Sequence, residues 1–157
     1  MANASPRAGL TLKVKRTFQA PIENVWAAWA EPKQLEHWMC RDKPEHVTKY
    51  RELEFRKGGR YLIENTTKGG VFLGSGTYEE IQPLEKIVFT WSWEREESGK
   101  KTKVDDPTRV TVEFRRRGEA TEVLLTHELL PNEAQRKAHE DGWNGCFEKL
   151  AEFLQQG

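Results

Sequence analysis

The C-terminal stretch HEDGWNGCFEKLAEFL, residues 139–154, decides the fold, because its side chains separate into one apolar and one polar face. Successive residues of an α-helix are rotated by about 100°, which gathers the apolar side chains into one stripe. This stripe contains His139, Gly142, Trp143, Cys146, Phe147, Leu150, Phe153 and Leu154. The pattern predicts a long amphipathic helix from about 132 to 155, with Pro131 before a cap at Asn132.

The same stretch contains residue types that bind metals, but their spacing argues against a metal site. His139 and Cys146 stand two helical turns apart, about 10 Å along the axis. Bonds from zinc to its ligands are only about 2.0 to 2.3 Å long, so one ion does not bridge them. The carboxylates of Asp141 and Glu148 point away from the stripe. We therefore expect neither a metal ion nor another cofactor.

Upstream of the helix, the sequence alternates in the manner of an antiparallel sheet. Residues 10–18 predict a first strand, and two short helices follow in 20–32 and 32–40. From Val47 to Leu130, six runs of β-branched and aromatic residues are separated by short turn signals, which indicates consecutive strands. The charged stretch EREESGKKTKVDD, residues 94–106, is interpreted as a solvated loop.

These elements predict an α+β helix-grip fold, in which a curved antiparallel sheet wraps around the long C-terminal helix. One face of the sheet needs a cover, and the C-terminal helix is the long element that can supply it. We expect one domain over residues 10–157, preceded by a flexible tail at 1–9. Such a sheet encloses more volume than one helix fills, so a cavity is expected between them.

The composition limits the classes of partner. The chain has 157 residues with 25 Lys plus Arg and 25 Asp plus Glu, so no overall field attracts nucleic acid. No apolar run approaches the roughly 20 residues of a membrane span. Two cysteines are too few for a disulfide framework, which favours a reducing compartment. We expect a cytoplasmic protein, either monomer or homodimer, that binds no nucleic acid.

Five segments together resemble a known family: FQAPIENVWAAWAEPKQLEHWM, FRKGGRY, GTYEEIQPLEKIVFTWSW, ATEVLLTHELLP and HEDGWNGCFEKLAEFL. In order and spacing they resemble the domain homologous to the C-terminal part of the activator of Hsp90 ATPase. This domain belongs to the START/Bet v 1-like (SRPBCC) superfamily. The resemblance implies the helix-grip fold and a cavity that in relatives holds lipids, polyketides or other apolar molecules. It carries no signature of an enzymatic subgroup.

The candidate ligand-binding residues are mostly aromatic side chains on faces expected to meet inside the fold. They are Trp38, Tyr61, Phe72, Tyr78, Trp91, Trp93, His127, Trp143 and Phe147. His127 alternates with Val123, Leu125 and Leu129, so it is either a core histidine with satisfied partners or a polar anchor in the cavity. Gly142 either admits a strand backbone or leaves space. Gly74 and Gly76 either let the sheet bend or open room between aromatic side chains.

The function favoured by the sequence is the binding of a small apolar or amphipathic molecule, with no catalytic residue assigned. One alternative is a co-chaperone-like module that acts on an Hsp90-type chaperone through the outer face of the sheet. Another alternative is a cyclase or hydrolase-like enzyme, which would need a polar pair converging in the cavity.

Overall fold

The computed structural model describes residues 9–41, 43–97, 100–103 and 107–156. Residues 1–8 of the expected tail lie outside this part. The elements follow along the chain as β1 (Leu10–Phe18), α1 (Ile22–Ala30), α2 (Pro32–Leu35), β2 (Val47–Leu53), β3 (Arg60–Thr67), β4 (Gly70–Gln82), β5 (Lys86–Glu97), β6 (Lys100–Lys103), β7 (Thr108–Arg117), β8 (Ala120–Leu130) and α3 (Glu133–Gln156).

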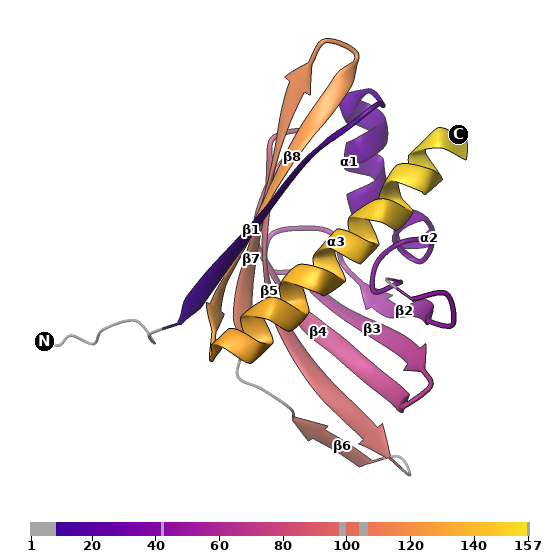
Figure 1. Cartoon of the computed structure of the whole chain (residues 1–157), viewed down its shortest axis with the longest axis vertical. Helices are drawn as coiled ribbons and strands as arrows, with labels where there is room; N and C mark the ends of the chain where they lie inside the picture. Colours follow the sequence, from indigo (N-terminus) through magenta and orange to yellow (C-terminus); the bar gives the residue numbers. More distant parts are fainter. Residues whose placement is uncertain (1–8, 42, 98–99, 104–106, 157) are drawn as a thin grey trace, which may run out of the picture.

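The strands form one curved antiparallel sheet, and α3 crosses one of its faces (Figure 1). The strand order is β1-β8-β7-β5-β4-β3-β2, with β6 paired to β5 off this path. Most neighbouring strands are consecutive in sequence and joined by short turns. The exceptions are the β5–β7 pair and the β1–β8 pair, which joins the first and last strands of the chain. The architecture confirms the predicted helix-grip fold.

Two local features differ from the sequence predictions. The stretch predicted as a loop includes β6, whose residues KKTK lack the apolar alternation by which a strand is predicted. In β8, the inward alternation breaks after His127, because Leu129 adopts a left-handed φ of 69°. The register between β1 and β8 shifts at this point, so Leu130 is buried in the core and Leu129 is only half-buried.

The segment from α1 to residue 40 fills the end of the core beside α3. Trp29 of α1 packs edge-on against Trp38, with 4.6 Å between the ring centroids. The Trp38 indole Nε1–H donates a hydrogen bond to the Ala28 carbonyl oxygen over 3.0 Å. Leu35 and Trp38 are both almost fully buried, as predicted for one side of a second short helix.

The helix α3 begins at the predicted cap, where the Gln135 backbone N–H donates to Asn132 Oδ1 over 2.9 Å. Its buried residues all belong to the predicted stripe and lie from the middle of the helix onward: Trp143, Cys146, Phe147 and Leu150. Phe147 meets Phe18 of β1 edge-on at 5.6 Å. The helix is therefore anchored to the sheet by its middle and C-terminal part, whereas its first turns are less buried.

Leu150→Ala tests this anchoring. Leu150 is completely buried, so its truncation should lower the free energy of unfolding by about 2 to 5 kcal/mol, as buried leucine truncations do. Urea unfolding measures the change. Glu152→Ala, on the exposed side of the same helix, is the matched control and should change stability by no more than about 0.5 kcal/mol. A Leu150→Ala effect as small as that of the control would contradict the helix-grip packing.

Candidate functional site

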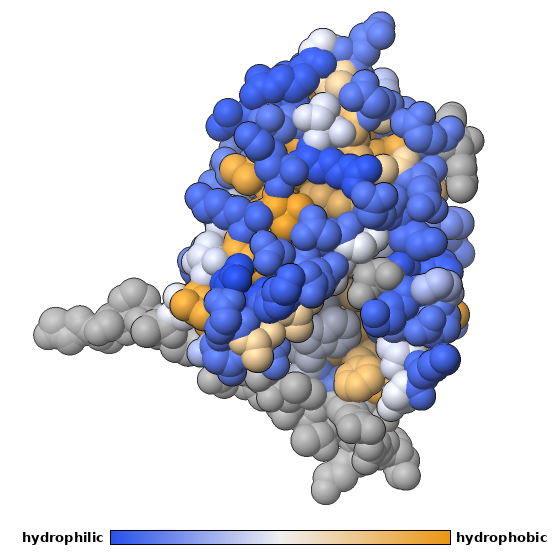
Figure 2. All heavy atoms as spheres, in the orientation of Figure 1, coloured by the Kyte–Doolittle hydropathy of each residue, from blue (hydrophilic) through white to orange (hydrophobic). Residues whose placement is uncertain are grey.

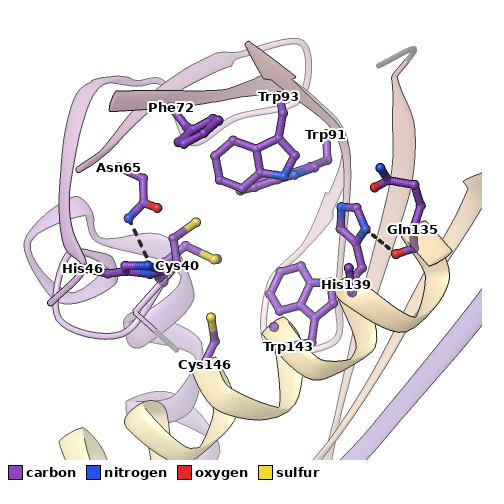
Figure 3. Close-up of a pocket in the computed structure, with 13 residues that line it drawn as sticks. Cys40, His46, Asn65, Phe72, Trp91, Trp93, Gln135, His139, Trp143 and Cys146 are labelled. Carbon is purple, nitrogen blue, oxygen red and sulfur yellow. Dashed lines mark hydrogen bonds between the residues drawn. The ribbon is translucent and has the colours of Figure 1, made fainter. Parts of the chain in front are cut away.

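A cavity of about 360 Å³ lies between the first half of α3 and the sheet. Figure 2 shows apolar residues exposed in a hollow beside α3, on a face that is mostly hydrophilic but also has apolar residues elsewhere. Figure 3 shows the side chains that converge on the cavity from both layers and from the segment after α2. The lining residues are Met39, Cys40, His46, Asn65, Phe72, Trp91, Trp93, Gln135, Ala138, His139, Gly142, Trp143 and Cys146.

Aromatic rings form two opposing walls of the cavity. Trp91 and Trp93 project from the same side of β5, with 5.1 Å between their ring centroids, and Phe72 of β4 meets Trp93 at 6.4 Å. Trp143 of α3 stands 6.3 Å from Trp91. The absence of a side chain at Gly74 makes room for the Trp91 ring, because a Cβ at this position would lie only 3.1 Å from the indole. Sheet and helix together therefore make an aromatic slot.

Gly142 leaves open space rather than admitting a strand backbone. A Cβ built on Gly142 would meet no atom within 4 Å outside its own helix neighbourhood. The sequence left both alternatives open, and the structure decides for the open space. Glycine is unfavourable inside a helix by about 1 kcal/mol relative to alanine, so Gly142 widens the cavity at the expense of helix propensity.

The segment after α2 contributes the polar and sulfur-bearing end of the cavity. The backbone carbonyl oxygen of Cys40 accepts hydrogen bonds from His46 Nδ1 and Asn65 Nδ2, both over 3.2 Å. These bonds hold Cys40 at a φ of 60°, a left-handed conformation that is uncommon outside glycine. Met39, Cys40 and Cys146 supply sulfur atoms to the lining (Figure 3).

A chain of hydrogen bonds links the helix wall to the sheet wall through His127. The Trp143 indole N–H donates to His127 Nδ1 over 3.0 Å, and His127 Nε2 lies 2.7 Å from Thr108 Oγ1. Because an indole only donates, Nδ1 carries no proton and a neutral His127 is protonated at Nε2. His127 therefore donates to Thr108, whose hydroxyl donates to the Trp91 carbonyl oxygen over 3.1 Å. Every donor in the chain has an acceptor.

Burial is the main cause that lowers the pKa of His127 from its ordinary value of 6.5 to about 3, and electrostatic repulsion from the neighbouring His139 is the smaller cause. The imidazole is fully buried and does not line the cavity. His127 is thus the satisfied core histidine of the two alternatives, and not a polar anchor for a ligand. A catalytic base needs a pKa near the working pH, which this residue lacks.

Four of the nine candidate residues line the cavity: Phe72, Trp91, Trp93 and Trp143. Trp38, His127 and Phe147 are buried in the core behind it, so their expected place in the cavity wall is corrected. Each is held there by core contacts, such as the bond from Trp38 to the Ala28 carbonyl. Ligand binding by Phe72, Trp91, Trp93 and Trp143, and by Tyr61 and Tyr78, stays a prediction.

Tyr61 and Tyr78 face a second, much smaller cavity of about 10 Å³, room for about one water molecule. It shares Met39 and Trp91 with the main cavity. The Tyr61 hydroxyl donates to the Thr90 carbonyl oxygen, and burial raises the pKa of both tyrosines. Trp29 also lines this space, and its Nε1–H is the buried side-chain donor without a partner among the described residues.

Some of the remaining cavity residues were not predicted from the sequence. Gln135 and Ala138 extend the apolar stripe of α3 by one turn toward its start, and the stripe itself supplied His139, Gly142 and Cys146. Asn65 follows Tyr61 and Ile63 at alternate positions of β3, a signal that would have placed it on the inner face. Met39, Cys40 and His46 come from an irregular segment, where no periodicity applies.

The described lining has no permanently charged side chain. Among the described residues around the cavity there is no Lys, Arg, Asp or Glu. Within the described part of the chain, no group of three or more His, Cys, Asp or Glu residues could hold a metal ion. No helix in that part is long and apolar enough to cross a membrane.

The fold and cavity define a helix-grip protein, and the family can be stated from its sequence profile. The profile described as "Activator of Hsp90 ATPase homolog 1-like protein" matches residues 19–155. The chain therefore belongs to this family, within the START/Bet v 1-like superfamily. A comparison with curated proteins gave no match.

Solved structures show the same fold. A protein from Arthrobacter aurescens is 22% identical with a TM-score of 0.82, over 94% of this chain and 87% of that one. A protein from Rhizobium leguminosarum is 24% identical with a TM-score of 0.81, over 96% and 97%. The AHSA1-like protein from Aeromonas hydrophila is 21% identical with a TM-score of 0.74, over 94% and 93%. At these identities the likeness concerns the fold alone.

The neutral state of His127 makes stability depend on pH. Its folded pKa of about 3 lies below the ordinary 6.5, so only the unfolded state takes up this proton as the pH falls from 6.5 toward 3. The contribution of the neutral His127 to the free energy of unfolding is fully present above the unfolded pKa. Below that pKa it is lost by about 1.4 kcal/mol per pH unit. His127→Gln, which does not titrate, removes this dependence.

Urea unfolding of the wild type and His127→Gln at a series of pH values separates this effect from other titrating groups. At about pH 8, the wild type should be more stable by about 1 to 3 kcal/mol, because the variant disturbs the hydrogen-bond chain. The advantage should shrink as the pH falls to about 5. A constant difference over this range would show that His127 has the same pKa in the folded and unfolded protein, and would contradict the buried neutral ring.

Proposed function

We propose that this protein binds a small apolar or amphipathic molecule in the cavity between α3 and the sheet. The observation that carries the proposal is a space of about 360 Å³ whose lining, among the described residues, includes the rings of Phe72, Trp91, Trp93 and Trp143 and no Lys, Arg, Asp or Glu. Ligand sites are typically concave, mostly apolar and about 300 to 1,000 Å³ in volume, with a few placed polar groups. Asn65 and His139 are polar groups of this kind.

The binding free energy would come from removing apolar surface from water. At about 30 Å³ per molecule, the cavity corresponds to about a dozen waters, which a ligand would displace. Each 100 Å² of apolar surface buried contributes about 2.5 kcal/mol before the entropic cost of association. Because the Trp143 ring is fixed by His127, the aromatic wall is largely formed before the ligand arrives.

The two alternatives are distinguished from ligand binding by their dependence on the cavity. A module that acts on a chaperone through the outer sheet face would keep its activity when the cavity is filled. An enzyme would need a polar pair in the cavity, and His127, the residue considered for such a role, has both ring nitrogens engaged elsewhere.

Titration with the neutral fluorescent probe N-phenyl-1-naphthylamine tests the proposal. The folded protein should bind about one probe per chain and transfer excitation energy from Trp91, Trp93 or Trp143 to it. Gly142→Leu should abolish this binding, because Gly142 lines the cavity and the new side chain would enter its open space. Its stability should stay within about 1 kcal/mol of the wild type, since the leucine meets no backbone and improves helix propensity.

Asn144→Leu is the matched control, because it adds the same side chain to the exposed face of the same helix. This variant should bind the probe as the wild type does. Equal binding by Gly142→Leu and the wild type would place the probe outside the cavity and contradict the proposal. Absence of probe binding by the wild type would favour the interaction-module alternative.

A further inference from the structure

We propose that the cavity selects neutral aromatic molecules that carry a hydrogen-bond donor, such as a phenol, and that Asn65 Oδ1 accepts this donor. The inference rests on the proposed function and adds the chemical class of the ligand. It follows from the orientation of the Asn65 amide, from the hydrogen bond made by His139 and from the cavity lining, which has no permanently charged side chain in the described part of the chain.

The orientation of the Asn65 amide is fixed by three acceptors around its nitrogen. Nδ2 lies 3.2 Å from the Cys40 carbonyl oxygen, 3.4 Å from the Val47 carbonyl oxygen and 3.4 Å from Thr48 Oγ1. The Thr48 hydroxyl donates its proton to the Met39 carbonyl over 2.6 Å, so toward Asn65 its oxygen acts as an acceptor. All three neighbours act as acceptors toward Asn65, so the NH₂ group of the amide lies on this side.

The amide oxygen is therefore turned away from these neighbours. Asn65 is only 4% exposed, and no described residue donates a hydrogen bond to its Oδ1. Figure 3 shows this oxygen on the cavity side of the residue, opposite the bond to Cys40. Trp29 Nε1, and not Asn65 Oδ1, is the fully buried side-chain atom without a partner among the described residues, so Oδ1 is accessible from the cavity. A ligand hydroxyl or N–H group at this end of the cavity would donate to it, whereas a ligand without a donor would cover it and leave it without a hydrogen bond.

His139, the polar residue on the helix wall, also offers a hydrogen-bond acceptor. His139 Nδ1 lies 2.8 Å from the Gln135 backbone carbonyl, which only accepts, so Nδ1 carries a proton. In the neutral imidazole the remaining nitrogen, Nε2, is then an acceptor. Two walls of the cavity thus offer acceptors to a ligand. An ether or an ester supplies no proton to either of them.

The lining also discriminates by charge and shape. Among the described residues around the cavity there is no Lys or Arg to balance an anion, so a carboxylate would lose its hydration without a counter-charge. The rings of Phe72, Trp91, Trp93 and Trp143 favour a flat aromatic body through stacked and edge-on contacts. A neutral aromatic donor meets all three requirements.

Three naphthalene derivatives test the class on the wild-type protein. Their dissociation constants are measured by tryptophan fluorescence at neutral pH for 2-naphthol, 2-methoxynaphthalene and 2-naphthoate. The naphthol should bind about 3- to 10-fold more tightly than its methyl ether, although the ether has more apolar surface. The naphthoate should bind more weakly than both.

The outcomes separate this inference from the proposed function. An ether that binds as tightly as the naphthol, or three equal affinities, would overturn the donor preference and leave the ligand-binding function in place. Failure of all three compounds to bind would overturn the proposed function and the inference together.

Asn65→Leu assigns the acceptor. In this variant the preference for naphthol over its ether should fall, because His139 Nε2 is then the acceptor that remains. Gln135→Leu is the matched control, since it replaces another polar lining residue on the opposite wall and should keep the preference. A preference that is undiminished in Asn65→Leu, or that falls in Gln135→Leu instead, would overturn the assignment to Asn65. If Asn65→Leu does not fold, the comparison of naphthol and ether on the wild type still decides the donor preference.

Discussion

The hydrogen bond from the Trp143 indole to His127 is the interaction on which the cavity depends. It joins the middle of α3 to β8 at the inner edge of the cavity, and Thr108 continues the chain to the backbone of β5 at Trp91. Two aromatic walls that come from different layers are thereby fixed relative to each other. The low pKa of His127 keeps the chain intact, because a protonated ring would have no acceptor for the indole.

This arrangement explains how one helix both closes the core and leaves a space. From Trp143 onward, α3 inserts its buried side chains against β1 and the segment around Trp29. Before Trp143, the inner side of α3 has small residues such as Ala138 and Gly142 and polar ones such as Gln135 in place of large apolar ones. The sheet face opposite them is therefore left uncovered. The change of residue size along a single stripe therefore divides the interior into a packed core and a cavity.

The sequence predicted the helix, the sheet and the aromatic wall, because these depend on periodicity. It did not decide between the two roles of His127, since alternation gives the face of a strand but not the partner that another element brings. Trp38 and Phe147 were assigned to the cavity for a similar reason: an apolar face does not say which residues pack and which line a space. Asn65 was missed although its position alternates with Ile63, because a single asparagine among charged and polar neighbours in β3 resembles a solvent-facing residue.

Native mass spectrometry of the purified protein tests the central claim, that the cavity is a binding site for a small molecule, most directly. The wild type should carry a small organic molecule that is released on denaturation, and Gly142→Leu, prepared in the same way, should have the bare mass of the chain. A bare wild type, or the same adduct on both proteins, would contradict the claim.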